Sequence, residues 1–253
     1  MNIWVCVKQV PDTDSVLFPQ GSDIDRSRLP YVINPYDEFS IEEALKIREQ
    51  FPGTVVTLLT VGPLRVEEAL RHGLAMGADV ALRICLEQES LDPLVVARLL
   101  AAVLKQRTVD LVFCGKQAVD DDSALVGAAL AGILNWPHVS VVRKVTAEEK
   151  IVVAEKETDG GVEIDEVQYP AVLTTQLGLN QPRFASLPGK LRAKKVLIEQ
   201  VDATRLGVDL TPTVNVERLD LPPQRLAGRM LAGSAVTQVQ TLLDALRQKK
   251  LLP

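Results

Sequence analysis

The chain has 253 residues and a mass of 27.6 kDa, and it is 47% hydrophobic, 24% charged and only 4% aromatic. This balance is ordinary for a globular protein and argues against wholesale disorder. A net charge of −5 without a broad basic region argues against a general nucleic-acid binder. With so few aromatic residues the core must be aliphatic, which suits parallel strands that are buried on both faces.

The sequence also bears on the compartment. Its N-terminal segment lacks the basic region and the long apolar run of a signal peptide. No stretch approaches the roughly 18 apolar residues of a membrane span. Cys6, Cys85 and Cys114 lie in apolar runs without metal-ligand spacing, which is typical of buried free thiols in a reducing environment. We therefore expect a cytoplasmic protein, or one in an equivalent reducing space.

The first 140 residues alternate between short apolar runs and helical periodicity. The apolar runs predict strands over Ile3–Val7, Val55–Val61, Val80–Ile84 and Asp110–Cys114. The periodic segments predict helices that begin at Asn34-Pro35, cover residues 66–74, begin at Asp92-Pro93 and cover residues 124–134. This alternation predicts right-handed crossovers and an α/β fold with a doubly wound, mostly parallel sheet.

The next part of the chain has a different pattern. Lys150–Glu157 and Val162–Val167 flank a turn sequence, Thr158-Asp159-Gly160-Gly161, which predicts an antiparallel hairpin at the sheet edge. Tyr169–Gln176 predicts a further strand, and Leu177–Lys190 reads as a loop.

The end of the chain is irregular from about Gln200 to Leu231, and helical spacing returns only between Val236 and Leu246. We therefore divide the chain into an α/β domain, residues 1–199, and a C-terminal arm with a helix, residues 200–253. Packing on another subunit would explain such an arm. Packing back on its own domain is the alternative.

A ligand site is expected where strands of the parallel sheet end, near helix N-termini. Strand ends at Cys6–Lys8, Thr60–Gly62 and Cys114–Gln117, with the helix start at Asn34, could form one crevice. Neither a G-x-G-x-x-G fingerprint after the first strand nor a G-x-x-x-x-G-K-[ST] loop occurs in the sequence. A nucleotide in this crevice would have to be held in another way.

The segment from Gly115 to Ala124 is the richest in polar groups. Gly115 permits close approach of the backbone, and Lys116 and Gln117 supply hydrogen-bond donors. Three aspartates and Ser123 precede a predicted helix, whose free N–H groups could hold phosphate. The alternative is that the aspartates only cap this helix.

Catalytic patterns are scarce. His72 and His138 have no evident partner in the sequence, and no nucleophile elbow is present. The scarcity favours a protein that binds or holds a cofactor over a hydrolase.

A series of segments, in order, resembles the beta subunits of electron transfer flavoproteins. They are Val7–Pro11, Asn34–Glu38, Ala75–Asp79, Gly115–Asp122, Asp159–Gly161, Gln181–Pro188 and Pro222–Gly228. The resemblance runs from about residue 2 to 250 with few length changes. It implies a sheet of the adenine-nucleotide-binding type and a heterodimer with an alpha subunit that makes most contacts to FAD.

The resemblance further implies an electron carrier that is not itself an enzyme. Acyl-CoA dehydrogenases of fatty acid oxidation, or other flavin dehydrogenases, would deliver electrons through the FAD to a membrane quinone oxidoreductase. This subunit would bury a structural AMP. The implied cofactor-binding residues are Cys6, Asn34, Pro35, Tyr36, Asp37, Val61, Gly115, Lys116, Gln117, Ala118, Val119, Asp120, Asp121, Asp122, Ser123, Ala124, Leu125 and Val126.

The same resemblance implies a docking site. Leu187 would lie in a mobile recognition loop and insert into a hydrophobic pocket of a dehydrogenase, and Glu157 would pair with a dehydrogenase arginine. The basic cluster from Lys190 to Lys195 could steer acidic partners. Tyr36 would approach the flavin of the alpha subunit.

Two other functions remain open. In the electron-bifurcating branch of the family a second FAD replaces AMP, and those members tend to carry glycine where this chain has Asp121. ATP-binding stress proteins and ATP pyrophosphatases share the fold class but need glycine-rich phosphate loops, which this sequence lacks.

Overall fold

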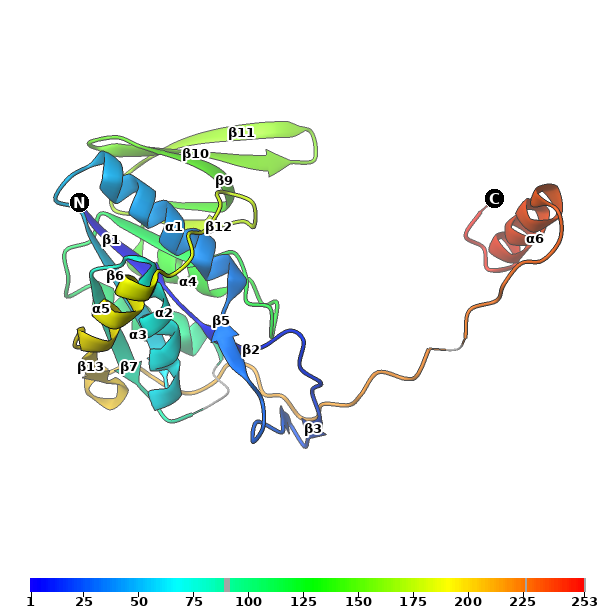
Figure 1. Ribbon diagram of the computed structural model, residues 1–253, viewed down its shortest axis with the longest axis horizontal. Helices are drawn as coiled ribbons and strands as arrows, with labels where there is room; N and C mark the ends of the chain where they lie inside the picture. Colours follow the sequence, from blue (N-terminus) through cyan, green and yellow to red (C-terminus); the bar gives the residue numbers. More distant parts are fainter. Residues whose placement is uncertain (89–91, 226, 253) are drawn as a thin grey trace. The chain divides into compact units, whose positions relative to one another are not determined.

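The computed structural model describes residues 1–88, 92–225 and 227–252. The chain forms two compact units, Met1–Leu219 and Asp220–Pro253. The first unit carries a large sheet with helices on both faces, and the second carries one helix (Figure 1).

A nine-stranded sheet with the order β11-β10-β9-β12-β8-β1-β6-β7-β13 forms the first unit. Its strands are β1 Asn2–Cys6, β6 Val55–Gly62, β7 Val80–Cys85, β8 Leu111–Gly115, β9 His138–Ala147, β10 Ile151–Thr158, β11 Gly161–Gln168, β12 Ala171–Thr175 and β13 Glu199–Asp202. Within this sheet, the adjacent strands of the series β9-β12-β8-β1-β6-β7-β13 are parallel to one another. Strand β10 is antiparallel to both β9 and β11. The predicted mostly parallel sheet with an antiparallel edge hairpin is therefore confirmed.

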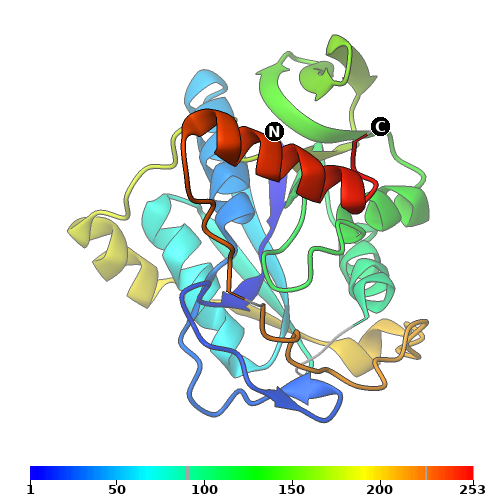
Figure 2. The ribbon, with the colours of Figure 1, turned by 90° about the vertical axis from the view of Figure 1, so that its right-hand side faces the viewer.

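Helices cover both faces of this sheet (Figure 2). They are α1 Pro35–Gln50, α2 Glu67–Met76, α3 Pro93–Leu104, α4 Val126–Leu134 and α5 Leu187–Lys195, with short 3-10 turns η1 Leu64–Val66 and η2 Ala203–Leu206. The strands and helices predicted in the first 140 residues lie within about two residues of these bounds.

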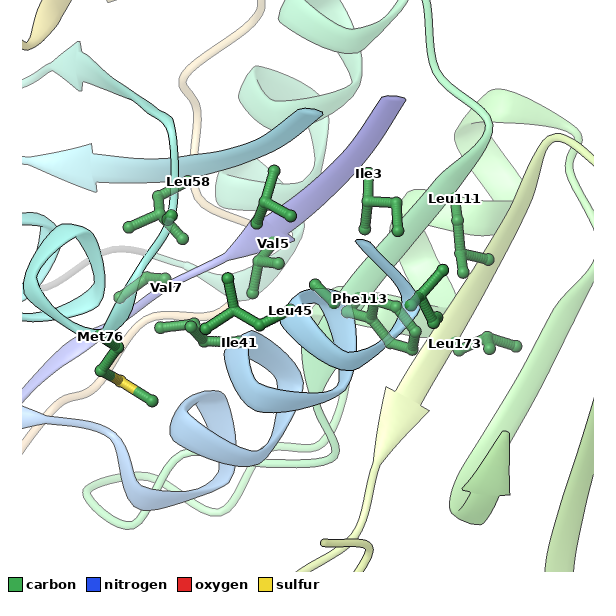
Figure 3. Packing of buried hydrophobic residues seen from close by; sticks show 14 of the residues in the cluster. Ile3, Val5, Val7, Ile41, Leu45, Leu58, Met76, Leu111, Phe113 and Leu173 are labelled. Carbon is green, nitrogen blue, oxygen red and sulfur yellow. The ribbon is translucent and has the colours of Figure 1, made fainter. Parts of the chain in front are cut away.

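Two hydrophobic cores follow from the alternation of side chains along β1. Ile3 and Val5 point to the face covered by α1 and α2, and Trp4 and Cys6 point to the face covered by α3 and α4. Figure 3 shows Ile41 and other α1 side chains packed over the first of these faces. Burial of both faces explains why the strands are continuous apolar runs rather than alternating ones.

The segment between β1 and α1, residues 7–34, has no helical or strand periodicity in its sequence. It forms two short ribbons, β2 Gln9–Pro11 with β5 Tyr31–Ile33, and β3 Pro19–Gln20 with β4 Asp23–Ile24. These strands are two or three residues long, too short for an alternating pattern to reveal them in the sequence.

The expected loop over residues 177–190 is wrong in its last part, because α5 begins at Leu187. Ser186 caps this helix by accepting a hydrogen bond from the Gly189 N–H at 3.1 Å, and Pro188 occupies the first turn. A serine followed by proline is a helix-start signal, but the short, basic helix lacks an apolar stripe that would extend it.

Two further elements were not predicted. Strand β9 begins at His138 and carries Arg143 and Lys144, so charged residues interrupt its apolar pattern. Strand β13 lies partly in the segment expected to be irregular, and its four residues at the sheet edge are mostly polar and none is buried. Pairing with β7, rather than its own composition, makes this segment a strand.

The second unit contains helix α6, Ala235–Gln248, which includes the segment predicted from helical spacing. Ser234 caps it by accepting a hydrogen bond from the Thr237 N–H at 3.3 Å, and none of its residues is buried. The first unit extends to Leu219, whereas the expected arm began at residue 200. Residues 226 and 253 of that arm lie outside the described residues. Packing of this helix on a partner subunit stays a prediction.

Candidate functional site

The carboxyl ends of β1, β6 and β8 and the start of α1 surround a cavity of about 580 Å³. The predicted cofactor-binding residues that line it are Cys6, Asn34, Asp37, Val61, Gly115, Lys116, Gln117, Ala118, Val119, Asp120, Asp121, Ser123, Ala124, Leu125 and Val126. Pro35, Tyr36 and Asp122 belong to the same segments but do not line it. One crevice thus unites strand ends that are up to about 110 residues apart in sequence, as expected for this fold class.

Asp37 joins the strand ends to α1. It lies in the first turn of α1, is 4% exposed, and accepts hydrogen bonds from the Lys8 N–H at 2.7 Å and the Gly115 N–H at 3.1 Å. The Asn34 side chain donates a third at 3.0 Å. Burial raises the pKa of Asp37 to about 7, although these hydrogen bonds and the charge of Lys8 act to lower it.

Asn34 occupies the predicted N-cap position of α1, but its side chain does not cap the helix. Its amide Nδ2 instead donates to the Gln117 carbonyl at 3.0 Å, and its Oδ1 accepts from the Val119 N–H at 3.3 Å. The side chain therefore holds the loop that follows β8 against the start of α1.

The three aspartates of this loop do not cap α4, so the capping alternative is wrong. Helix α4 begins at Val126, two residues later than predicted, and its N-cap position is Leu125 without a capping side chain. Asp122 and Ala124 have left-handed backbone conformations, with φ of 49° and 50°, which delay the helix start. Among the described residues no side chain caps the first turn of α4, and Val126, its first residue, lines the cavity.

Each aspartate instead has a partner within the site. The Lys8 Nζ lies 2.7 Å from Asp120 Oδ1 and 2.9 Å from Asp121 Oδ2, and Gln117 Nε2 donates to Asp122 Oδ1 at 2.7 Å. Burial acts to raise the pKa of Asp121, but Lys8 and hydrogen bonds from Lys8 and Ser123 hold it below its usual value. Lys8 belongs to a strand end that was expected to form the crevice, but it was not among the cofactor-binding residues implied by the resemblance.

Gly115 is required by packing. A Cβ on Gly115 would lie 2.3 Å from Asp37 Oδ1 and 2.7 Å from the Tyr36 Cβ. The close approach that this glycine permits is therefore with α1, in addition to any approach of a ligand.

Cys6 and Cys114 lie on neighbouring strands, are buried, and line the cavity as free thiols. A hydrogen bond with Cys6, and then burial, raise the pKa of Cys114 well above its usual value. Cys85 is also free but only half-buried. The two small, buried side chains present a compact apolar wall.

Neither histidine lines the cavity. His72 has a partner that the sequence did not reveal: its Nε2 lies 2.8 Å from Glu38 Oε1. Burial, and then Lys156, lower the pKa of His138, whose Nε2 has no hydrogen-bond partner among the described residues.

The segment between β1 and α1, residues 7–34, forms the other side of the cavity. Its lining residues include Asp12, Ser15, Asp23 and Arg26. Arg65, in η1 after β6, also lines the cavity. These residues were missed because neither periodicity nor a known strand-end position marks them.

The two predicted docking residues lie away from the cavity lining. Leu187 begins α5 and is 72% exposed. Glu157 lies near the end of β10 and forms an ion pair with Arg143 of β9. Both side chains are accessible on the described surface.

Comparison with known proteins identifies the family. The sequence model of the electron transfer flavoprotein domain matches residues 22–206. The chain is 42% identical over 213 residues to the mouse electron transfer flavoprotein subunit beta, covering 83% of this chain and 84% of that protein. The chain belongs to the electron transfer flavoprotein family, among its beta subunits. Its place is therefore in electron transport.

Two other members of the family extend the match. The rice (Oryza sativa subsp. japonica) mitochondrial electron transfer flavoprotein subunit beta is 38% identical over 254 residues, which cover 98% of each chain. The human subunit beta is 39% identical over 233 residues, covering 90% of this chain and 91% of that protein. Within the described ranges, the structure contains no helix with the length and apolar character to cross a membrane.

Proposed function

We propose that this chain holds a structural AMP in the cavity at the strand ends and acts as the beta subunit of an electron-carrying heterodimer. The observation that carries the proposal is that the N-terminus of α4 has no capping side chain among the described residues and lies next to a loop in which Lys8 pairs with Asp120 and Asp121. Free N–H groups at a helix N-terminus favour a phosphate group. A phosphate beside unpaired carboxylates would be repelled, whereas Lys8 removes much of that repulsion.

The remaining wall of the cavity suits the rest of a nucleotide. Cys6, Cys114 and Val61 present apolar surface for a flat base, and Lys116 and Gln117 are donors close to the loop. A cavity of about 580 Å³ is within the range of about 300–1,000 Å³ that is common for small-molecule sites. AMP would thus stabilise the packing of β1 and β8 against α1 and would take no part in electron transfer.

The redox chemistry would come from FAD, which accepts and donates electrons and would be held mostly by an alpha subunit. This chain would supply Tyr36 near that subunit and helix α6 as part of the interface. The apolar residues of α6, Val236, Val239 and Leu242, support this role because they are 80%, 56% and 47% exposed in the described part of the chain.

Dehydrogenases would dock at Leu187, with Glu157 as a secondary polar contact. An exposed leucine at the start of a fixed helix fits a hydrophobic pocket of an acyl-CoA or other flavin dehydrogenase. Electrons would then leave through the FAD to a membrane quinone oxidoreductase. The chain alone would have no turnover, and its free cysteines fit the cytoplasm or an equivalent reducing space.

The test is to co-purify the chain with its alpha subunit, denature the complex and identify the released nucleotides by chromatography and absorbance. One AMP and one FAD per heterodimer are expected. Two FAD would move the chain to the electron-bifurcating branch. ATP without a stable partner would contradict both and favour a stress-type nucleotide-binding protein.

A further inference from the structure

A partly buried ion pair, between Arg183 and Glu42, joins the segment before α5 to α1. Glu42 is only 6% exposed, and both its carboxylate oxygens accept from Arg183. The Nε–Oε2 and Nη2–Oε1 distances are 2.7 and 2.9 Å, and the Arg183 backbone N–H also donates to Oε2 at 3.1 Å. Glu49, one heptad further along α1, accepts from Nη1 at 2.8 Å. This arrangement is a bidentate clamp with a second, exposed contact.

The clamp acts on a segment with no regular structure of its own. Residues 177–186 lie between β12 and α5, and Asn180 Nδ2 adds contacts to the Phe39 carbonyl at 3.0 Å and Glu43 Oε2 at 2.9 Å. The path of residues 177–186 toward α5 is therefore fixed mainly by side-chain hydrogen bonds of Asn180 and Arg183 and not by pairing with a strand.

Helix α5 is fixed from its other side by α2. A Cβ on Gly189 would lie 2.3 Å from the Ala75 carbonyl, so the two helices approach closely there. Arg192 Nη2 donates to the Leu74 and Ala78 carbonyls at 2.6 and 3.2 Å. The start of α5 is therefore held between two anchored points.

Between these anchors the chain presents an apolar stripe. Phe184, Leu187 and Leu191 are 97%, 72% and 56% exposed, and the last two are four residues apart on α5. A side chain held in place before it meets its partner avoids the entropy cost of ordering on binding. The bidentate contact between Arg183 and Glu42 gives this segment one defined orientation.

We propose that Arg183 is a positioning residue for dehydrogenase docking, which holds the start of α5 so that Leu187 and Phe184 meet the partner in one orientation. The inference rests on the docking role proposed for Leu187. The partner surface would be an apolar pocket on a flavin dehydrogenase, and Arg183, already committed to α1, would not contact it.

The test uses the purified heterodimer as electron acceptor for an acyl-CoA dehydrogenase that is reduced by its acyl-CoA substrate. KM for the heterodimer and kcat are measured for Arg183→Gln, Leu187→Ala and the double variant, with AMP and FAD content as checks. Arg205→Gln is the matched control, since Arg205 is an exposed arginine paired with Asp202 outside this region.

We expect Arg183→Gln to raise KM about tenfold, which corresponds to about 1.4 kcal/mol, with kcat and nucleotide content unchanged. Arg183→Lys should recover only part of this, because an ammonium cannot reproduce the bidentate geometry. In the double variant the two effects should not add, since a misplaced leucine has less contact to lose.

The outcomes separate the inference from the function on which it rests. If Leu187→Ala raises KM while Arg183→Gln matches the Arg205→Gln control, the positioning role is wrong and the docking role stands. If Leu187→Ala has no effect, the docking role itself fails. If Arg183→Gln does not assemble, Glu49→Gln decides, because it leaves the Glu42 pair intact: a KM raised about twofold supports positioning, and a KM equal to the control contradicts it.

Discussion

Replacing Gly115 by alanine should damage the site through one added methyl group. That Cβ would lie 2.3 Å from Asp37 Oδ1, 2.7 Å from Tyr36 Cβ and 3.1 Å from Asn34 Nδ2. Overpacking of this kind costs about 1–3 kcal/mol. Displacing Asp37 would also weaken its hydrogen bonds to the Gly115 and Lys8 N–H groups, and one such bond to a charged group contributes about 1.5–3 kcal/mol. Because the neighbouring side chains can relax in part, we expect the free energy of unfolding to fall by about 3 kcal/mol.

The assay is urea unfolding of the purified heterodimer, with AMP content measured in parallel. Gly132→Ala is the matched control, because Gly132 lies in α4 with nothing within 4 Å of an added Cβ. That control should be stabilised by about 0.5–1 kcal/mol, since alanine favours a helix. A Gly115→Ala complex as stable as wild type, with full AMP content, would refute the proposed packing of β8 against α1.

Two further predictions concern pH and the anchoring of the chain after η2. Asp92 caps α3 through Leu94 and also accepts hydrogen bonds from the N–H groups of Thr213 and Val214, which hold its pKa well below the usual range despite some burial. Its contribution is therefore present above pH 3.8 and lost as pH falls toward the folded value, so Asp92→Ala should cost about 1–2 kcal/mol at pH 7 in urea unfolding and much less near pH 2. If Asp92→Ala lowers the free energy of unfolding equally at both pH values, this account of Asp92 is wrong. Asp37 has the opposite sign: its pKa rises from 3.8 to about 7 on folding, so its contribution is present below pH 3.8 and is lost as pH rises through 7. Melting temperatures of wild type should fall between pH 5 and 8, and Asp37→Asn should remove that slope; an unchanged slope would show that another group titrates.

Much of the first 140 residues could be predicted from the sequence because two simple periodicities operate there. Strands such as Val55–Gly62 are buried on both faces, and Asn34 and Asp92, each followed by proline, mark the starts of α1 and α3, although only Asp92 caps its helix. The common edge where these strands end also followed from topology alone, which is why the cavity lies where it was expected.

The parts that could not be predicted depend on tertiary contacts. Strand β13 exists because β7 pairs with it, and the role of Asn34 depends on a loop more than 80 residues away. The path into α5 depends on an arginine that meets α1 across about 140 residues of sequence. No local pattern records such contacts, so the site could be located from the sequence but its hydrogen bonds could not.

The matched pair Lys8→Met and Lys46→Met tests most directly whether AMP is held at the loop after β8. The two lysine side chains are 43% and 44% exposed and both form ion pairs, but Lys8 pairs with Asp120 and Asp121, which line the cavity, whereas Lys46 pairs with Glu43, which does not. AMP and FAD per heterodimer are measured for both variants. The account predicts that Lys8→Met lowers the affinity for AMP about tenfold or more, about 1.4 kcal/mol, with FAD retained and Lys46→Met unchanged. Full AMP occupancy in Lys8→Met after dialysis would contradict it.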